Sequence, residues 1–286
     1  PANSDSLVTL NATMDAAALR ELLRNLLFAS TRVEIDRSRL DRWREMLDRL
    51  PPYAANDDGA LKEWLTDALV DNYEHRHMSH LYPLYPGDEA DRDETPELHD
   101  MVLQAFRKRM EHFNPKEYGG FGLYHVAMAA ARAGDAETAW DAVEHMAQWH
   151  VYSGMSTSHN HGPTIVNMDA SGGVPAALVE MLVVSRAGKV RLLPALPKAL
   201  SVGSIIGVCC RGGIVIDRLE WNIPGRSVVA VLRADTDQHV EVTLPTLEST
   251  PTIHVSDESC VVQRSGDSIW LTLSAGTPLS LRVSWE

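Results

Sequence analysis

The chain has 286 residues, of which 44% are hydrophobic and 23% charged, and its formal net charge is −13. This length favours two domains, and the composition excludes the disordered, collagen-like and disulfide-dense classes of protein. The negative charge disfavours nucleic acid and anionic membrane surfaces as partners, and no apolar run has the length of a transmembrane helix, whereas neutral ligands such as sugars are compatible with the sequence.

The first part of the chain shows the apolar spacing of helices. Leu40, Trp43 and Leu47 fall on one helical face, and Pro51 ends that helix. No internal repeat indicates a solenoid, and paired antiparallel helices can instead close into a toroid. The predicted helices, joined by short polar turns, cover residues 15–30, 36–50, 59–70, 95–113, 121–133, 136–149 and 173–185.

After Gly188 the period of the apolar pattern changes from that of a helix to that of a strand. Alternating or β-branched runs separated by turns are typical of an antiparallel β-sandwich. These runs cover residues 228–233, 240–244, 269–273 and 279–285. The sequence therefore predicts a helical domain at residues 1–187 and a β-sandwich domain at residues 188–286.

The most unusual segment reads EHRHMSHLYPLYPG and covers residues 74–87. Its histidines and arginine, with Trp64 nearby, concentrate hydrogen-bond donors and aromatic faces, which suits recognition of the hydroxyl groups of a sugar. One alternative is a purely structural hydrogen-bonded turn. Another is a Zn²⁺ site built on His75, His77 and His80, which would need further ligands and supporting hydrogen bonds.

Several segments resemble a known family. LKEWL at residues 61–65 and HRHMSHLYPLYPG at residues 75–87 resemble the paired signatures of the inverting α-L-fucosidases of glycoside hydrolase family 95. NATMD at residues 11–15, VRLLPALP at 190–197 and RGG at 211–213 are similar to further segments of that family and follow in the same order. The resemblance covers nearly the whole chain and implies part of an (α/α)₆ toroid followed by an antiparallel β-sandwich.

The resemblance also implies roles for individual residues. In that family a Glu acts as the acid, an Asp acts as the base, Asn residues polarise the base, and the Arg and second His of the His-Arg-His string contact the fucose. Carried over to this chain, Arg76 and His77 are substrate contacts. Asp169 is the base, because NMDASGG at residues 167–173 is similar to a family pattern resembling QIDGNFG.

Asp169 and His161 each have an alternative role. Inversion needs a general base that activates water and a general acid on the other side of the sugar, with carboxyl groups about 6.5–9.5 Å apart. Asp169 suits the base, but it could instead cap the helix predicted from Gly173. His161 belongs to the segment SGMSTSHNHG, which is expected to be a rim loop that lines the site, whereas a Ser–His nucleophile pair there lacks a nucleophile elbow.

The chain also departs from the family pattern. The acid Glu and the Asn residues are not found, and Asp5 is the carboxylate nearest to the expected position of the acid. FGLY at residues 121–124 stands where the family has a Trp-bearing segment. Glu63, beside Trp64, is expected either to orient a sugar hydroxyl or to lie on a helix surface.

We therefore expect a glycoside hydrolase fragment that cleaves terminal α-L-fucosyl or related L-sugar linkages with inversion. Its expected partners are an oligosaccharide or glycoconjugate substrate and the missing N-terminal portion of the same enzyme, and no cofactor or metal ion is expected. Arg76, His77, Trp64 and His161 are expected to bind the substrate. The alternative function is a non-catalytic or degenerate carbohydrate-binding homologue.

Overall fold

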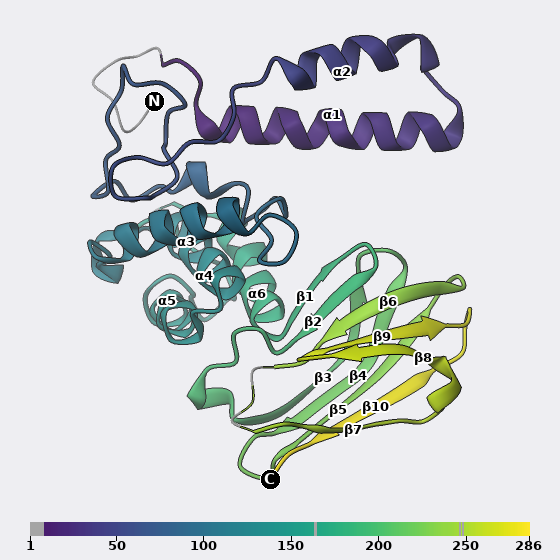
Figure 1. Ribbon diagram of the computed structural model, residues 1–286. Coiled ribbons are helices and arrows are strands. Elements are labelled where there is room, and N and C mark those ends of the chain that lie inside the picture. The colour runs from purple at the N-terminus through teal and green to yellow at the C-terminus, as the bar shows by residue number, and fades with distance from the viewer. Residues whose placement is uncertain (1–8, 163–164, 246, 248) are drawn as a thin grey trace. The chain divides into compact units, whose positions relative to one another are not determined.

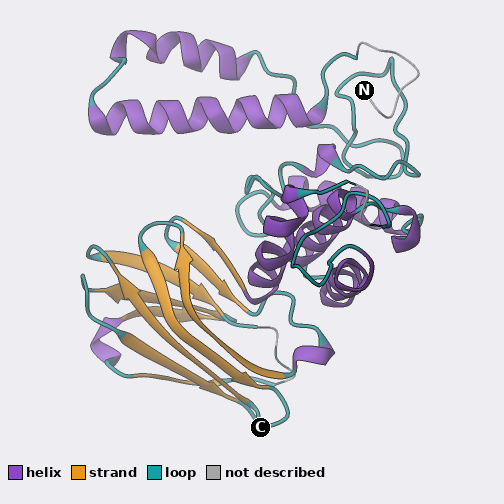
Figure 2. Cartoon of the chain, turned by 180° about the vertical axis from the view of Figure 1, so that it is seen from behind, coloured by secondary structure: helices purple, strands orange, loops and turns teal. Residues whose placement is uncertain are grey.

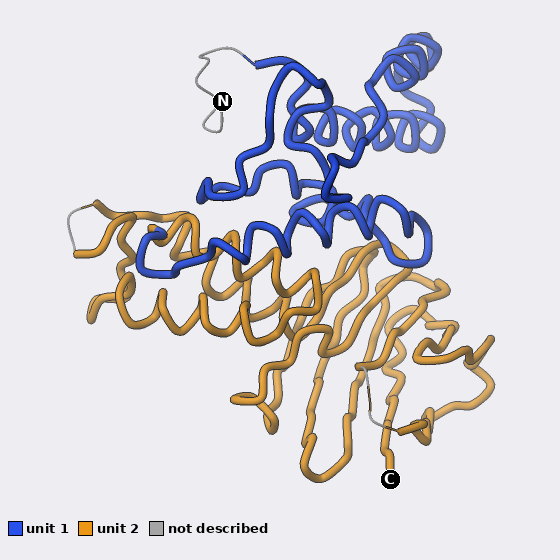
Figure 3. The backbone as a smooth tube through the Cα atoms, turned by 60° about the vertical axis from the view of Figure 1, so that its left-hand side comes forward, with its two compact units in different colours: residues 1–118 blue, residues 119–286 orange. Residues whose placement is uncertain are grey.

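A computed structural model describes residues 9–162, 165–245, 247 and 249–286. The chain folds into two compact units, Pro1–Tyr118 and Gly119–Glu286 (Figure 3). Within the described residues, no helix combines the length and the apolar character that crossing a membrane requires.

The first unit contains the long helix α1 (Thr13–Val33) and the shorter helices α2 (Leu40–Asp48) and α3 (Pro96–Met110). Helices α1 and α2 run side by side (Figures 1 and 2). The turn between them uses two left-handed residues, Glu34 and Asp36, with φ angles of 57° and 56°. Helices are thus confirmed in all three of these predicted regions.

The predicted helix at residues 59–70 is wrong, because this segment forms turns and isolated bridges. The Asn56 side chain accepts hydrogen bonds from the backbone N–H groups of Asp58 and Ala60, both at 3.1 Å. Gly59 takes a left-handed φ of 75° within this turn. A side chain that accepts hydrogen bonds from nearby backbone N–H groups in this way competes with helix formation. The segment pairs instead with the start of α1, where Thr13 N–H donates to the Glu63 carbonyl at 2.9 Å.

The second unit begins with helices α4 (Gly120–Ala133), α5 (Ala136–Trp149) and α6 (Met168–Leu182). Helix α4 ends at Gly134, which is left-handed with a φ of 76°, and Asp135 caps α5 by accepting from Thr138 N–H at 3.1 Å. A left-handed glycine after the last turn and an aspartate at the N-cap are common signals for the end and the start of a helix, and the helices predicted at residues 121–133 and 136–149 are confirmed. Helix α6 begins before the predicted start at Gly173, because Asn167 caps it and accepts from Ala170 N–H at 3.0 Å.

Two five-stranded sheets follow, with strand orders β1-β2-β6-β9-β8 and β3-β4-β5-β10-β7 (Figures 1 and 2). The strand β2 pairs with β6 in parallel, and the other pairs are antiparallel. The first sheet comprises β1 (Val183–Arg186), β2 (Lys189–Leu192), β6 (Gln238–Thr243), β8 (Val261–Ser265) and β9 (Ser268–Leu273). The second comprises β3 (Val202–Cys210), β4 (Ile214–Asn222), β5 (Ser227–Ala234), β7 (Thr252–Val255) and β10 (Leu279–Ser284).

The two sheets share one apolar core. Every second residue of β5 is buried, which is the pattern of a strand with one face on a core. Fully buried side chains from both sheets, such as Leu219, Val242 and Leu271, belong to this core. The predicted sandwich is therefore confirmed, with one parallel pair that the sequence pattern did not indicate.

The helices α4 to α6 belong to the same compact unit as the sandwich. The end of α6 joins the first sheet, because Leu193 N–H donates to the Leu182 carbonyl at 2.7 Å. The division into domains at residues 1–187 and 188–286 follows the change from helices to strands and stays a prediction.

Candidate functional site

The segment that carries Arg76 and His77 is held by a buried ion pair in the first unit. Glu63 and Arg109 are 4% and 1% exposed. The Arg109 guanidinium contacts the Glu63 carboxylate and donates to the His75 carbonyl. The other Glu63 oxygen accepts from Asn72 N–H at 3.3 Å. Neither expectation for Glu63 is met, because the carboxylate lies in the interior and anchors the loop before Arg76.

Burial lowers the pKa of Arg109 to about 10, which leaves the guanidinium charged at neutral pH. A buried charge is tolerated only when it is paired and hydrogen-bonded. Glu63 provides the opposite charge and the His75 carbonyl provides an acceptor. The pair is thus a structural support for the segment that carries Arg76.

Arg76 is exposed and His77 is half-buried. The backbone N–H of His77 donates to Nδ1 of His75 at 3.1 Å, and the two rings lie 5.2 Å apart. Burial is the main reason that the pKa of His75 is lowered, so His75 is a neutral acceptor that shapes the turn. The Arg76 side chain remains accessible to a ligand, as its expected role requires.

Trp64 and His80 lie in the interior of the first unit, with exposures of 4% and 2%. For Trp64 this burial favours packing over a sugar contact. Burial lowers the pKa of His80 to about 3. Its Nδ1 is 3.6 Å from a Glu63 oxygen, but the ring is neutral at physiological pH and forms no ion pair there.

The metal alternative built on His75, His77 and His80 receives no support from the geometry. Within the described ranges, the three residues that bring potential ligand atoms within 4.8 Å of one another are His145, His150 and His161. These lie in the second unit.

Asp169 lies in the first turn of α6 and is exposed. Its alternative role as the N-cap is wrong, because Asn167 occupies that position. A carboxylate in the first turn of a helix interacts favourably with the helix dipole. The exposed side chain of Asp169 is accessible to a ligand at this end of α6, as the expected role of a general base requires.

Small residues bring α6 against α4 and so determine where Asp169 lies. A Cβ atom on Gly173 would lie 2.5 Å from Cγ of the Tyr124 ring. A Cβ atom on Gly120 would lie 2.6 Å from the Ser158 carbonyl oxygen. Only glycine fits at such distances, so Gly173 sets the spacing between α6 and α4, and Gly120 sets the spacing between α4 and the loop at Ser158.

An aromatic face of α4 lies beside Asp169, and the sequence reasoning missed it. Phe121, Tyr124 and His125 are half-buried, and the ring of His125 is 4.7 Å from Phe121 and 4.4 Å from Tyr124. Burial lowers the pKa of His125, and the nearby Asp169 charge opposes that shift. The spacing of three and four residues was the available signal, since it places these rings on one helical face.

His161 lies in a loop between α5 and α6 and is exposed. Its ring stacks near Trp149 at 6.0 Å and lies 4.9 Å from the ring of His150. The loop is tied to α4 and to the start of α6, because the His159 carbonyl accepts from Gly120 N–H at 2.8 Å and Asn167 N–H donates to the Thr157 carbonyl at 2.9 Å. The loop is thus part of the support for Asp169.

The Ser–His alternative in this loop is structural. Ser158 is 2% exposed, and its Oγ is 3.3 Å from Nδ1 of His150. The hydroxyl proton is donated to the Asn160 carbonyl at 2.6 Å. A buried hydroxyl whose proton is already engaged is not placed for nucleophilic attack.

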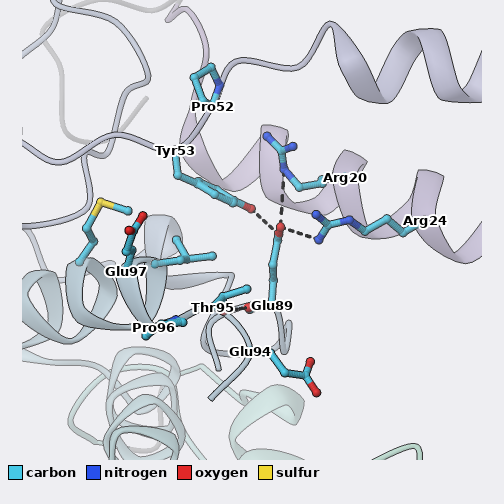
Figure 4. A pocket seen from close by; sticks show the side chains of 11 residues that line it. Arg20, Arg24, Pro52, Tyr53, Glu89, Glu94, Thr95, Pro96 and Glu97 are labelled. Carbon is cyan, nitrogen blue, oxygen red and sulfur yellow. Dashed lines mark hydrogen bonds and ion pairs between the residues drawn. The ribbon is translucent and has the colours of Figure 1, made fainter. Parts of the chain in front are cut away.

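The first unit also contains a pocket of about 520 Å³ that none of the predicted site residues lines (Figure 4). Glu89 lies at its centre and accepts from Tyr53 Oη at 2.6 Å and from Arg24 Nη1 at 2.5 Å. Burial raises the pKa of Tyr53, with a further contribution from Glu89. Both carboxylate oxygens are engaged, so Glu89 organises the pocket wall and is not poised as an acid.

The predicted pair of substrate contacts and the predicted base fall in different units. Arg76 and His77 belong to the first unit, and Asp169 and His161 belong to the second. A pocket shared by them stays a prediction. Asp5, the carboxylate nearest to the expected acid, lies outside the described residues.

Models of glycosyl hydrolase domains match both parts of the chain. The family 95 catalytic domain matches residues 1–182, and the family 95 C-terminal domain matches residues 184–277. A helical part of the α/α toroid type followed by two β-sheets, with these matches, defines the class as glycoside hydrolases. Because the catalytic model alone covers more than half of the chain, the chain belongs to glycosyl hydrolase family 95.

Two similar proteins that are named as fucosidases agree with this assignment. Alpha-L-fucosidase 2 from Arabidopsis thaliana is 30% identical over an alignment of 234 residues, gaps included, that covers 77% of this chain and 27% of that protein. Probable alpha-fucosidase A from Aspergillus niger is 29% identical over an alignment of 208 residues that covers 62% of this chain and 23% of that protein. The chain thus spans about a quarter of the length of the relatives it matches.

A solved structure shows the same fold. The α-L-rhamnosidase from Dictyoglumus thermophilum superposes with a TM-score of 0.53 over 93% of this chain and 31% of that chain. At 9% identity the likeness concerns the fold alone.

Proposed function

We propose that this chain forms part of an inverting glycosidase that releases a terminal α-L-fucosyl residue, or a related L-sugar, from an oligosaccharide or glycoconjugate. The observation that carries the proposal is the exposed Asp169 carboxylate in the first turn of α6, beside the rings of Tyr124 and His125. The names of the two fucosidase relatives support the choice of sugar.

Asp169 acts in this proposal as the general base. Its carboxylate accepts a proton from water, and that water attacks the anomeric carbon on the face opposite the leaving group. The aromatic face of α4 provides an apolar wall against which the C–H groups of a sugar ring can pack. Arg76 and His77 donate hydrogen bonds to sugar hydroxyls, and the general acid is supplied by a residue outside the described part of the chain.

The experiment is hydrolysis of an aryl α-L-fucoside followed by proton NMR, with the longest reading frame that contains these 286 residues. The proposal predicts that the first sugar released is the β-anomer, because attack by water inverts the anomeric centre. Release of the α-anomer first would contradict the proposed mechanism. A matched aryl α-L-rhamnoside substrate tests the choice of sugar.

A non-catalytic carbohydrate-binding protein is the second candidate. It is favoured by one observation, the departure of the sequence from the family pattern at the acid Glu. Calorimetric binding of a fucosylated oligosaccharide with no sugar released over a day would support this candidate and overturn the enzyme.

A further inference from the structure

We propose that His145, His150 and His161 bind a divalent transition-metal ion, with Zn²⁺ as the first choice. One nitrogen from each side chain lies within 4.8 Å of the other two. His145 lies on α5, His150 caps the C-terminal end of that helix, and His161 lies in the loop that leads to α6. The proposed site thus joins two segments of the second unit and departs from the expectation that the chain holds no metal.

The hydrogen bonds of His150 favour metal binding at one particular nitrogen. Ser158 Oγ has a single proton, which it donates to the Asn160 carbonyl at 2.6 Å. The same oxygen lies 3.3 Å from Nδ1 of His150 and must therefore accept a proton from it. His150 is then the neutral tautomer with its proton on Nδ1, which leaves the Nε2 lone pair available for a metal ion.

The surroundings of this lone pair point to a ligand. His150 is fully buried, and its Nε2 has no hydrogen-bond partner among the residues that the structure describes. An unpaired polar atom in a protein interior is unfavourable and calls for a partner. A metal ion would satisfy Nε2, and the Ser158 hydroxyl on the other nitrogen is the kind of support that orients metal-binding histidines.

The types of ligand indicate which metal ions the site would hold. Metal ions bind the neutral imidazole of histidine. Three neutral nitrogen ligands with no carboxylate favour Zn²⁺, Cu²⁺ or Ni²⁺ over Mg²⁺ and Ca²⁺.

Closing the site around a metal ion requires modest movements of the three rings. The ring centroid of His161 is 4.9 Å from that of His150 and 5.8 Å from that of His145. In a tetrahedral zinc site with Zn–N distances of about 2.0–2.1 Å, the nitrogens lie roughly 3.4 Å apart. The ring centroids of His145 and His150 are 6.4 Å apart, so these two side chains must also approach each other, and His161 is exposed and belongs to a loop. Its exposure leaves the fourth position open to water or to a ligand.

A metal ion bound at this site would restrain the loop that precedes α6. Asn167, the cap of α6, follows this loop, and its side-chain amide lies 3.1 Å from Nδ1 of His159. A metal ion on His161 would restrain the loop between α5 and this cap. The inference does not depend on the proposed glycosidase activity, because metal binding is measured without substrate.

The test is a metal titration of the full chain purified without a polyhistidine tag and treated with EDTA. We expect about one equivalent of Zn²⁺ by calorimetry, and visible d–d bands of tetrahedral intensity when Co²⁺ is used instead. His161→Ala removes an exposed ligand without disturbing the interior and should weaken Zn²⁺ binding at least about tenfold. His145→Gln, a second ligand variant, should do the same.

His254→Ala is the matched control, since His254 is an exposed histidine of β7 in the same unit. It should bind Zn²⁺ as the parent does. Absence of binding at about 100 µM Zn²⁺, above the range of working protein sites, would overturn the proposal. So would unchanged affinity in both ligand variants, or an equal loss in the His254→Ala control, which would indicate adventitious surface binding.

Discussion

The side chains that hold Arg76 in place are charged and buried, and their energetics follow from that burial. Glu63 and Arg109 form an ion pair within the first unit, and Arg109 also supports the backbone at His75. Removing one partner of such a pair leaves the other as an uncompensated charge in a medium of low polarity. The segment that presents Arg76 should then lose its support.

Arg109→Ala is therefore expected to lower the free energy of unfolding by about 3–5 kcal/mol. Urea denaturation followed by circular dichroism measures the change. Arg44→Ala is the control, because Arg44 and Asp41 form an exposed pair at 2.9 Å whose loss should alter stability little. Equal midpoints for the two variants would show that the buried pair contributes nothing beyond a surface pair.

His80 gives the first unit a pH dependence whose sign can be worked out. Burial lowers its pKa from 6.5 to about 3, so between these pH values the unfolded chain binds more protons than the folded one. Stability from this group is complete above about pH 6.5 and is lost as the pH falls towards 3. The slope is about 1.4 kcal/mol per pH unit where only the unfolded state is protonated.

Comparing the parent with His80→Leu isolates this contribution. The free energy of unfolding should fall more steeply in the parent than in the variant between pH 6 and 4, by roughly 1 kcal/mol per pH unit. Denaturant titrations at several pH values provide the slopes. Parallel slopes would mean that His80 keeps an ordinary pKa in the folded chain.

Arg76 is expected to act on substrate and not on the fold, because its side chain is exposed. Arg76→Lys keeps the charge but removes the planar pair of donors that suits two sugar oxygens. We expect kcat/KM for an aryl α-L-fucoside to fall by about 10–100-fold, which corresponds to one charged hydrogen bond. The melting temperature should stay within a degree or two, and Arg92→Lys, an exposed neighbour in the same unit, should leave kcat/KM unchanged.

At the scale of the element, the packing of α6 on α4 depends on the absence of a side chain at Gly173. The adjacent Gly172 has no such role. A Cβ on Gly173 would collide with the Tyr124 ring of α4, whereas a Cβ on Gly172 would meet nothing within 4 Å. Gly173→Ala should lower the free energy of unfolding by about 1–3 kcal/mol, because the packed ring must move. Gly172→Ala should raise it by about 0.5–1 kcal/mol, because alanine favours the helix.

The two variants serve as controls for each other, because the two glycines are adjacent in the same helix. Thermal unfolding monitored by circular dichroism gives both values. Changes of the same sign would contradict the packing of α6 on α4 that positions Asp169.

The sequence was informative about elements where a local signal agreed with the packing. Gly134 and Asp135 marked the junction of α4 and α5, and the alternating pattern of β5 marked a strand. The predicted helix at 59–70 failed because Asn56 forms a turn with its own backbone and the segment pairs with residues far away in the chain. Helical periodicity cannot reveal such pairing.

The candidate site was predictable only in part. The motif around Asp169 marked a carboxylate, but not the helix cap at Asn167 or the aromatic face of α4. Glu63 looked like a surface or ligand residue because its partner Arg109 is 46 positions away and its burial follows from tertiary contacts. The histidines of the proposed metal site are also separated in sequence and only the fold brings them together.

At the scale of the whole molecule, the chain has a family assignment and divides into two compact units. The chain belongs to glycosyl hydrolase family 95, and its catalytic match runs through both compact units. The central proposal concerns Asp169, which lies in the second unit and is proposed to be the general base of the glycosidase.

The most direct test is kcat of Asp169→Asn on an aryl α-L-fucoside, beside Asp141→Asn, which alters an exposed carboxylate on α5 of the same unit. Loss of general-base assistance should lower kcat by about 10²–10⁴-fold in the first variant, with the melting temperature and the control unchanged. A kcat within a few-fold of the parent in Asp169→Asn would contradict the account.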